Sequence, residues 1–452
     1  MSFRAEGLGA ALASGVKVLG KIYLPDLGIT KRCRDLASNE WRWWKQEKWI
    51  NVYTAPPEAI DPDKYIVCSY YVEPGEAIEG SAQAAGMEIA AEESIGTWTT
   101  VKTAEPLRYA GKVFKVEAKG DGHIVQIAFP LELFDVEAGL SHLLSDVSGN
   151  LYGLSAIKNV RFLDFHPPKA YLKEFKGPKF GIEGVREIVG TKADRRPHLG
   201  TIIKPKVGLS PKETAEVAYE AAVGGVDFIK DDETLTSQKF CPLLDRLTSV
   251  MEKLDKAKEE TGRTVMYALN ITSDLNRLFD YADKAIANGA NCLMVDFLCV
   301  GLPALRALAE DPSVKVPIHV HRCMHAAMTR NPKHGIHMMV LAKLVRLAGG
   351  DQLHTGTAAG KMEKPGGKAA EVRRVNDFLR EEWNHVKPTM PVASGGVHPA
   401  LVPYNLERLG RDIVVNAGGG IHGHPWGTRA GAKAMRAAFD AALKGVSLEE
   451  YA

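Results

Sequence analysis

The chain has 452 residues, of which 45% are apolar and 25% charged, and its formal net charge at pH 7 is +2. This is the composition of an ordinary soluble globular protein. The small net charge gives no reason to expect nucleic acid as a partner, and no apolar run reaches the ~18 residues that a membrane span needs. Six scattered cysteines, without a CxxC pair or zinc spacing, are typical of a reduced cytoplasmic protein.

The first part of the chain predicts a small α+β domain. Residues 1–58 match no recognisable module and form an extension of unknown role. Lys64–Glu73 and Val113–Pro130 alternate like strands, and Glu76–Ala91 between them has helical periodicity. We therefore expect an α+β domain over residues 59–170, followed by a connecting segment over residues 171–195.

The rest of the chain, residues 196–452, alternates strand-like apolar runs with helix-like segments. The predicted strands are His198–Ile203, Val226–Ile229, Val265–Leu269, Asn291–Phe297, Val316–Val320, Asp351–His354, Met390–Ala393 and Asp412–Val415. The clearest predicted helices are Pro211–Ala222, Pro242–Glu260, Asp274–Ala287 and His334–Leu347. A doubly wound sheet can be built from such units, but eight of them in succession favour a closed (β/α)₈ TIM barrel. The predicted fold class is therefore α/β.

The most informative stretch is Asp-Phe-Ile-Lys-Asp-Asp-Glu at residues 227–233. Here Lys230 ends a short buried strand and three acids, Asp231, Asp232 and Glu233, follow it. Oxygen ligands suit a hard cation such as Mg²⁺, and a lysine amine that adds CO₂ becomes a carbamate, which is a further oxygen ligand. The alternative is a helix start whose acids face the helix dipole, with Lys230 as their counter-ion.

Other predicted strand ends carry groups that bind anions or move protons. In chain order these are Lys204 and Lys206, then His321, Arg322 and His325, then His354 with Lys361 beyond it, then Ser394-Gly395-Gly396, and last Gly418-Gly419-Gly420. Working residues of a barrel lie at the carboxyl ends of its strands, and glycine-rich ends offer backbone N–H groups to phosphate. A zinc site at His319, His321 and His325 is a weaker alternative, because the neighbouring residues are anion binders.

Together these groups predict a site for a phosphorylated sugar that is held by its ends. Mg²⁺ would polarise the carbonyl oxygen, and a lysine or the carbamate would remove the adjacent carbon-bound proton to give an enediolate. Lys361, on a glycine-rich loop, would close over the substrate and exclude water.

At this point the sequence resembles the large subunit of RuBisCO. The resemblance rests on Gly200–Lys206, Gly224–Glu233, His321–His325, His354–Thr357, Gly360–Glu363, Ser394–Gly396 and Gly418–Gly420, which follow in the family's order. Glu92–Trp98 and Gly149-Asn150 match in the smaller domain. The resemblance covers about residues 60 to 445.

Carried over position by position, the resemblance implies a role for each matching residue. Lys230 would be the carbamate and, with Asp232 and Glu233, would bind Mg²⁺. Lys204, Lys206, His321 and Lys361 would be catalytic. Arg322, His354 and Ser394 would bind one phosphate, and Thr97, Trp98, Gly395, Gly396, Gly418 and Gly419 the other. Glu92 and Asn150 would come from a partner subunit, because the family's minimal unit is a homodimer with shared active sites.

Departures from the family pattern favour one branch, the RuBisCO-like proteins. Lys364-Pro365 replaces the usual Gly-Glu beyond Lys361, and Gly177–Gly184 and the N-terminal extension also differ. We therefore predict Mg²⁺-dependent enolisation or isomerisation of a phosphorylated ketose without CO₂ fixation. The substrate would be one such as 5-methylthioribulose 1-phosphate, in sulfur and methionine salvage. The alternatives are a genuine ribulose-1,5-bisphosphate carboxylase, a decarboxylase or transcarboxylase of a phosphorylated keto-acid, and a catalytically silent regulatory protein.

Overall fold

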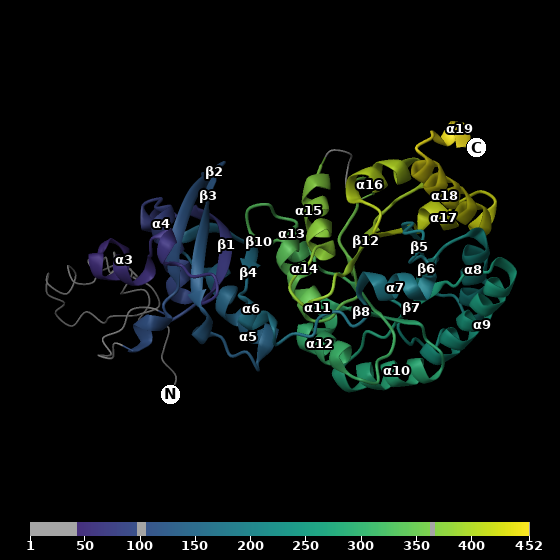
Figure 1. Cartoon of the computed structure of the whole chain (residues 1–452), viewed down its shortest axis with the longest axis horizontal. Coiled ribbons are helices and arrows are strands. Elements are labelled where there is room, and N and C mark those ends of the chain that lie inside the picture. The colour runs from purple at the N-terminus through teal and green to yellow at the C-terminus, as the bar shows by residue number, and fades with distance from the viewer. Residues whose placement is uncertain (1–42, 97–104, 362–366, 452) are drawn as a thin grey trace, which may run out of the picture. The chain divides into compact units, whose positions relative to one another are not determined.

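The computed structural model describes residues 43–96, 105–361 and 367–451, and the chain from Val52 onward forms one compact unit. Two sheets organise this unit, an open sheet of five strands and a closed barrel of eight (Figure 1). The predicted α/β fold, with a barrel after a smaller domain, is therefore confirmed. No helix among the described residues is long and apolar enough to cross a membrane.

The five-stranded sheet has the order β10-β4-β1-β3-β2. Its strands are β1 (Tyr65–Pro74), β2 (Lys112–Lys119), β3 (Gly122–Pro130), β4 (Ile157–His166) and β10 (Gly335–Ile336). Strands β2 and β3 form an antiparallel hairpin, so the predicted segment Val113–Pro130 is two strands and a turn. Helices α4 (Ala82–Glu92) and α5 (Gly139–Val147) belong to the same part of the chain, and helix α3 (Glu47–Tyr53) precedes it.

The single helix predicted over Glu76–Ala91 is divided in the structure. A short 3₁₀ turn, Glu76–Ile78, ends at Glu79 and Gly80, whose φ angles of 55° and 71° are left-handed. Helix α4 then begins after Ser81, whose side chain accepts a hydrogen bond from the N–H of Ala84. The chain needs this break because a left-handed residue cannot continue a right-handed helix.

The barrel strands are parallel and close in the order β11-β12-β13-β5-β6-β7-β8-β9. They are β5 (His198–Ile202), β6 (Phe228–Lys230), β7 (Met266–Asn270), β8 (Cys292–Asp296), β9 (Ile318–His321), β11 (Gln352–His354), β12 (Met390–Ser394) and β13 (Val414–Asn416). Each lies within one or two residues of a predicted strand, so the eight-strand prediction is confirmed. Their carboxyl ends share one rim, as parallel strands in a barrel must.

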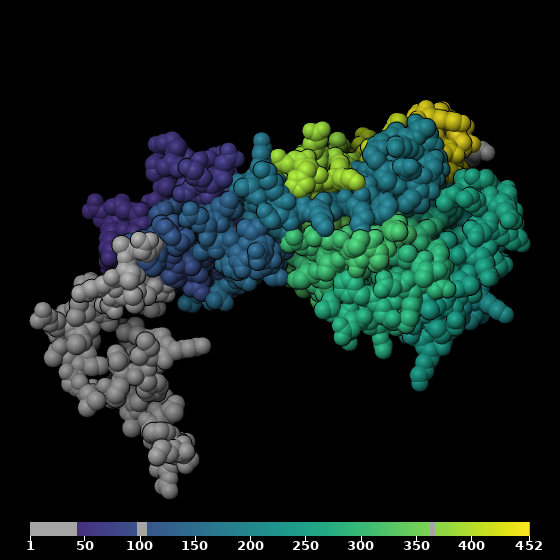
Figure 2. Space-filling view, turned by 60° about the horizontal axis from the view of Figure 1, so that its bottom comes forward, coloured from purple at the N-terminus to yellow at the C-terminus, as the bar shows by residue number. Residues whose placement is uncertain are grey.

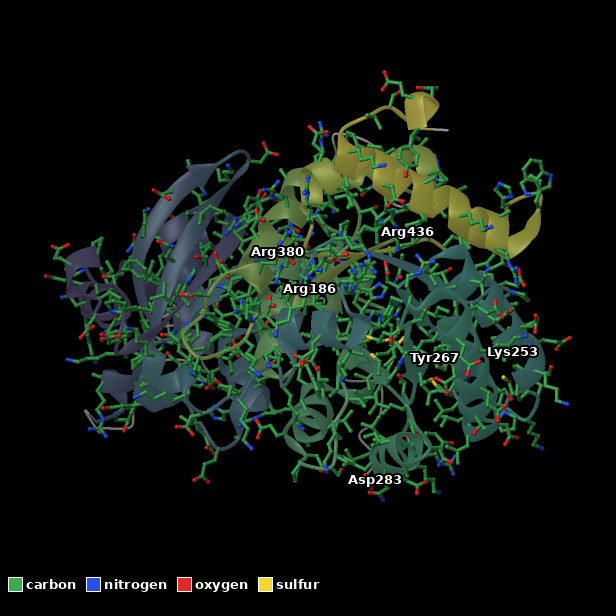
Figure 3. The ribbon with its side chains drawn as sticks, turned by 45° about the vertical axis from the view of Figure 1, so that its right-hand side comes forward. Arg186, Lys253, Tyr267, Asp283, Arg380 and Arg436 are labelled. Carbon is green, nitrogen blue, oxygen red and sulfur yellow. The ribbon has the colours of Figure 1, made fainter. Side chains whose placement is uncertain are left out.

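The barrel part of the chain also contains helices, most of which lie around the strands (Figure 1), and Figure 2 shows the packed outer surface of the chain. They are α8 (Pro211–Gly224), α9 (Leu243–Thr261), α10 (Leu275–Ala287), α11 (Phe297–Val300), α12 (Leu302–Glu310), α13 (Ala326–Thr329), α14 (Met338–Leu347), α15 (Ala369–Arg380), α16 (Val402–Leu409), α17 (Gly419–His422), α18 (Gly427–Lys444) and α19 (Leu448–Tyr451). Lys253 of α9 and Asp283 of α10 lie on the outer surface, whereas Tyr267 of β7 lies inside (Figure 3).

Helix α8 shows how the sequence delivers the chain to strand β6. Ser210 and Glu213 form a reciprocal capping box and Pro211 occupies the first turn. At the other end Gly225 closes the helix with a φ of 110°, which favours glycine. The chain then turns directly into Asp227 and β6, so that Lys230 reaches the rim.

The opposite end of the barrel is closed by helix α7 (Gly181–Val189), which α6 (Lys169–Leu172) precedes. Ile182, Val185 and Val189 of α7 share one buried apolar cluster with residues that begin the barrel strands, including Phe228 and Met266. This packing fills the amino-terminal end of the barrel and leaves the carboxyl-terminal end for polar groups.

Strand β10 was not predicted. The sequence predicts a helix over His334–Leu347, but α14 begins only at Met338. The residues before it pair in parallel with β4, Gly335 opposite Arg161 and Ile336 opposite Phe162. A tertiary pairing therefore overrides the local helical pattern, and it joins a barrel loop to the small sheet.

Candidate active site

The carboxyl ends of β5 and β6 bring a lysine and a carboxylate together. Lys204, two residues beyond β5, donates from Nζ to Asp232 Oδ2 at 2.7 Å. The hydroxyl of Thr234 donates to the other oxygen of Asp232 at 2.9 Å. Burial alone would raise the pKa of Asp232, but these hydrogen bonds outweigh it and lower the pKa. Asp232 is therefore an ionised acceptor at neutral pH.

Lys230 ends β6 and is almost fully buried, with only 1% of its side chain exposed. Its Nζ donates to the carbonyl oxygen of Asp231 at 2.6 Å and lies 3.6 Å from Glu233 Oε2. Burial lowers the pKa of the Lys230 amine, although the neighbouring carboxylates oppose this shift. A buried lysine with a lowered pKa offers a larger fraction of neutral, reactive amine.

The three acids after Lys230 do not form one cluster. Asp231 turns inward, where it accepts from Arg246 Nε and Nη2 at 3.2 and 3.1 Å and from the Tyr267 hydroxyl at 2.5 Å. The backbone N–H of Asn270 donates to it as well, at 2.9 Å. Only Asp232 and Glu233 therefore face the rim. Arg246, which is fully buried in α9, carries no local signal of this role, and sequence reasoning missed it.

Histidines from β9 and β11 lie across the rim. His321 shares a 2.5 Å hydrogen bond with Asp296 through Nδ1, and its Nε2 lies 3.6 Å from Glu233 Oε2. The rings of His321 and His354 are 4.6 Å apart at their centroids. Burial holds the pKa of His354 well below its ordinary value, so its ring is neutral. Asp296, at the end of β8, was also missed by sequence reasoning.

The predicted zinc alternative is not supported by the contacts of His319. Both of its ring nitrogens are engaged, Nδ1 with Gln352 at 2.8 Å and Nε2 with His354 at 2.9 Å. His325 instead bonds the Thr329 hydroxyl at 2.9 Å. The three histidines therefore do not turn toward one shared ion.

The predicted anion-binding groups lie on adjoining loops. Lys361 donates its backbone N–H to the carbonyl of Gly395 at 2.7 Å, so the loop after β11 lies against the loop after β12. A Cβ on Gly396 would meet the Lys361 backbone, which makes glycine necessary there. Gly418 lies beside the Lys204 side chain, because a Cβ there would be 3.4 Å from Lys204 Cε.

The remaining predicted residues are less closely connected to these groups. Burial lowers the pKa of Arg322 to about 10. Lys206 is exposed beyond β5. In the small domain, Asn150 Nδ2 donates to Glu92 Oε1 at 3.1 Å, so these two residues lie together. Thr97 and Trp98, and also Lys364-Pro365, lie outside the described residues.

The donor set at β6 fits a hard divalent cation. Asp232 and Glu233 offer carboxylate oxygens, and a carbamate on Lys230 would add another to the same corner. Without a cation or a carbamate, the ammonium of Lys230 would lie buried among acids as a simple counter-ion. Burial lowers the pKa of this amine while the neighbouring carboxylates raise it, so the fraction of neutral amine is increased by burial.

Known proteins with similar sequences cover both parts of the chain. The family model for the ribulose bisphosphate carboxylase large chain matches residues 181–452 with its catalytic domain and residues 57–171 with its N-terminal domain. A ribulose bisphosphate carboxylase of Pyrococcus horikoshii is 47% identical over 390 residues, which cover 86% of this chain and 89% of that protein. One of Methanocaldococcus jannaschii is 46% identical, covering 86% and 95%.

Solved structures of ribulose-1,5-bisphosphate carboxylases are also similar to this chain. The octameric ribulose-1,5-bisphosphate carboxylase/oxygenase of Pyrococcus horikoshii, crystallised with sulfate, superimposes with a TM-score of 0.83 at 45% identity, covering 89% of this chain and 93% of that one. A dimeric archaeal Rubisco from Hyperthermus butylicus gives a TM-score of 0.80 at 38% identity, covering 89% and 96%.

These relatives overturn the predicted reaction. Relatives with 46–47% identity are named carboxylases, so the prediction of a ketose enolase or isomerase that fixes no CO₂ is wrong, and methionine salvage has no support. Of the departures on which the prediction relied, Gly177–Gly184 runs into α7 at the far end of the barrel, and Lys364-Pro365 lies outside the described residues. Membership of the RuBisCO-like branch stays unconfirmed.

The family assignment itself no longer depends on short motifs. Its two domain models match residues 57–171 and 181–452, and the similarity to a solved structure covers 89% of the chain. Enzymes of this family use Mg²⁺ and a carbamylated lysine. The chain belongs to the RuBisCO large-chain family.

Proposed function

We propose that this chain is a ribulose-1,5-bisphosphate carboxylase. The observation that carries the proposal is the buried Lys230 amine beside Asp232 and Glu233, in a chain whose relatives bear that name. A composition and charge without special features are compatible with many enzymes, whereas a buried lysine beside two carboxylates supports carbamate formation and metal binding.

The proposed metal site is formed by Lys230, Asp232 and Glu233. The Lys230 nitrogen would bond to the carbon of CO₂ and release one proton, giving a carbamate that holds Mg²⁺ with the two carboxylates. Bound Mg²⁺ supplies a Lewis acid that polarises the carbonyl oxygen of the sugar. Because burial lowers the pKa of Lys230, more of the amine is neutral and able to react at a given pH.

Proton transfer is the proposed role of the lysines and histidine around this corner. Lys204 Nζ is held by Asp232 and lies beside Gly418, in a position to exchange a proton with the carbons of a bound sugar. His321 is oriented by Asp296, which fixes the ring that faces Glu233. Lys206, on the same loop as Lys204, would add positive charge near the reacting carbons.

The two phosphates of the substrate would bind on opposite sides of the corner. Arg322, His354 and Ser394 supply a cation and neutral donors for one of them. Backbone N–H groups at Gly395, Gly396, Gly418 and Gly419, together with Thr97 and Trp98, would hold the other. Lys361 is fixed through its backbone beside Gly395, so its side chain would close over the substrate and exclude water.

The active unit is proposed to be a homodimer with shared sites. The hydrogen bond between Glu92 and Asn150 groups two polar residues of the small domain, as an element that reaches another subunit would require. Mixing an inactive Lys204→Ala protein with an inactive Asn150→Ala protein should restore part of the activity through hybrid dimers. A verified hybrid that recovers no activity would exclude shared sites.

The reaction is tested with ¹⁴CO₂, ribulose 1,5-bisphosphate and Mg²⁺. We expect acid-stable label in phosphoglycerate, in an amount that matches the bisphosphate consumed. A Lys192→Ala protein, altered at an exposed lysine paired only with Glu187 at 3.6 Å, serves as the control and should fix CO₂ normally. If the enzyme exchanged the substrate's carbon-bound proton with solvent deuterium but fixed no label, the proposal would be wrong.

A further inference from the structure

A second group of ligand atoms lies beside the catalytic corner, at the end of β8, in α11 and just after β9. It consists of the Asp296 carboxylate and the thiols of Cys299 and Cys323, which we call the thiol site. One ligand atom from each residue lies within 4.8 Å of the other two. Each residue is on or next to a barrel strand end, so the backbone that carries these atoms is held by the barrel.

The two sulfur atoms are 3.4 Å apart. In a tetrahedral site with metal–sulfur bonds of about 2.3 Å, two thiolates lie roughly 3.8 Å apart. A metal ion therefore requires a shift of only a few tenths of an ångström. A disulfide, by contrast, needs the sulfurs to approach from 3.4 Å to about 2.05 Å, which is a larger displacement.

Access and charge also suit a cation. Cys299 is exposed, Cys323 is half-buried, and Asp296 is buried behind them. Burial raises the pKa of the Cys323 thiol, and Asp296 and Cys299 raise it further, because three groups that become anionic crowd one place. A bound cation would relieve that repulsion, and thiolates select soft metals over Mg²⁺.

We propose that Asp296, Cys299 and Cys323 bind one thiophilic divalent cation, such as Zn²⁺ or Cd²⁺, as a site distinct from the Mg²⁺ site. Asp296 has one carboxylate oxygen on His321 Nδ1, which leaves the other for the metal. The thiol site is thus linked to Glu233 through His321. Occupancy should inhibit the enzyme, a consequence that rests on the proposed function, whereas the binding itself does not.

Binding is measured with Cd²⁺ on the fully reduced protein, by the ultraviolet charge-transfer absorption of thiolate–Cd²⁺ bonds. We expect one Cd²⁺ per chain, retained in a large excess of Mg²⁺. The Cys299→Ser and Cys323→Ser double variant should lose the absorption. Each single variant should bind about 100-fold more weakly or worse, because even the loss of a supporting residue costs 10–100-fold in metal affinity. The exposed Cys299→Ser change alone keeps the test possible if the double variant folds poorly.

Cys33→Ser is the matched control. Cys33 is not one of the three residues of the thiol site, so this variant should bind Cd²⁺ as the unaltered protein does. Of the other cysteines that the structure describes, Cys68, Cys241 and Cys292 are buried. Thiol titration of the same samples establishes that Cys299 and Cys323 are free and not oxidised to a disulfide. Undiminished Cd²⁺ absorption in the double variant, or none in an unaltered protein with all its thiols free, would overturn the thiol site.

Discussion

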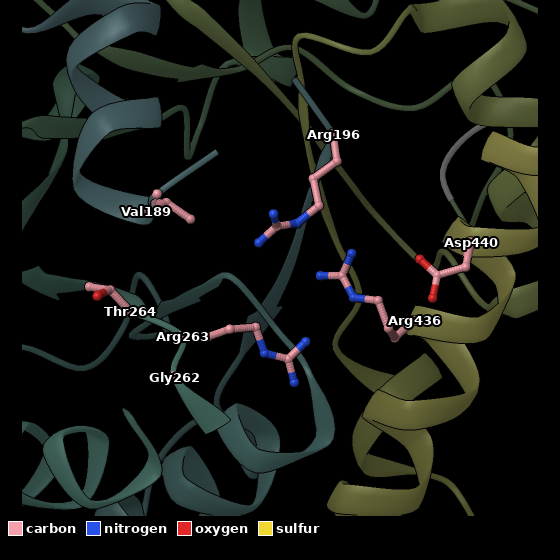
Figure 4. Close-up of a pocket in the computed structure, with 8 residues that line it drawn as sticks. Val189, Arg196, Gly262, Arg263, Thr264, Arg436 and Asp440 are labelled. Atoms are coloured by element: carbon pink, nitrogen blue, oxygen red, sulfur yellow. The ribbon is translucent and has the colours of Figure 1, made fainter. Parts of the chain in front are cut away.

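The two ends of the barrel use the same residue types in opposite ways. At the amino-terminal end Asp227, just before β6, accepts from Arg196 at 3.0 Å, from the Leu199 N–H at 2.9 Å and from Arg436. The guanidinium groups of Arg196, Arg263 and Arg436 point toward one another around a cavity of about 420 Å³ (Figure 4). At the carboxyl-terminal end carboxylates are paired with lysines instead, and Glu233 keeps 36% of its side chain exposed.

This difference shows that the charged groups at one end of the barrel stabilise the fold, whereas those at the other end are available for the reaction. An arginine holds its proton and binds a carboxylate in a fixed geometry, whereas a lysine can lose its proton when buried. The arginine-paired end therefore forms a permanent network. The lysine-paired end keeps groups that can change partner or protonation, and these are the groups that a reaction needs.

The largest effect on activity should come from Lys230→Ala. Loss of the carbamate removes a metal ligand, and the carboxylase rate should fall by on the order of 1,000-fold or more, since metal polarisation supplies several kcal/mol. Stability should fall as well, because the change leaves a cavity and removes the donor to the Asp231 carbonyl, so activity is compared on folded protein. Enzyme assays and urea unfolding of the two proteins measure both quantities. Full Mg²⁺-dependent activity in the variant would remove Lys230 from the metal site.

At the other end of the barrel, Asp227→Ala should act on stability alone. It leaves Arg196 and Arg436 without their buried partner, which should cost about 3–5 kcal/mol of the free energy of unfolding. The turnover of the molecules that remain folded should be unchanged. Glu183→Ala, which removes an exposed partner of Arg195, is the control and should cost less than about 1 kcal/mol. An equal loss of turnover in Asp227→Ala would show that the two ends are not independent.

Asp231 allows the two ends of the barrel to be compared within one motif. It is a neighbour in sequence of the proposed metal ligands Asp232 and Glu233, but its carboxylate is paired with an arginine, as that of Asp227 is. Asp231→Asn cannot accept from both Arg246 and Tyr267 as a carboxylate does, and should lose about 2–3 kcal/mol of stability. Its Mg²⁺ affinity, measured on folded protein, should stay unchanged. Asp232→Asn should instead lose Mg²⁺ affinity and keep its stability. A similar loss of Mg²⁺ affinity in both variants would show that Asp231 is a metal ligand.

The smallest effect concerns Asp351, which precedes β11 as Asp227 precedes β6. It accepts only backbone N–H groups, from Phe180, Gly181 and Ile318, and burial raises its pKa from 3.8 to about 6. As the pH rises, the unfolded chain releases this proton first. The stabilisation is therefore complete below about pH 4 and is lost between pH 4 and 6.

Urea unfolding of the unaltered protein and of Asp351→Asn measures this. The stability advantage of the unaltered protein should shrink by at most about 1 kcal/mol per pH unit between pH 4 and 6 and stay constant above. An advantage that does not change with pH would show that Asp351 is ionised throughout, as Asp227 is.

Much of this architecture could be predicted from the sequence because its signals are local. The eight barrel strands are short buried apolar runs, and the rim residues follow them directly, so Lys204, Lys230 and His321 could be placed at one end of the barrel. Strand β4 was missed. Its pairing with β1 contains two register shifts, which disturb the alternation that marks a strand.

The partners of the rim residues could not be predicted, because their pairing is created by the fold. Arg246 is 15 residues from Asp231 and Asp296 is 25 residues from His321, with no pattern that connects them. The reaction could not be predicted from the motifs either. Enolisation and carboxylation share their first proton transfer, so the residues that carry this step cannot separate the two reactions.

The pairing of β10 with β4 has a consequence for cutting this chain into pieces. In the sheet order β10-β4-β1-β3-β2, the outer side of β4 is paired at Arg161 and Phe162, by Gly335 and Ile336 from the barrel. Expressed without the barrel, the small domain would have β4 as a free edge, with unpaired backbone groups on a ten-residue strand. Such an edge recruits other strands, so the isolated domain should aggregate where the full chain does not.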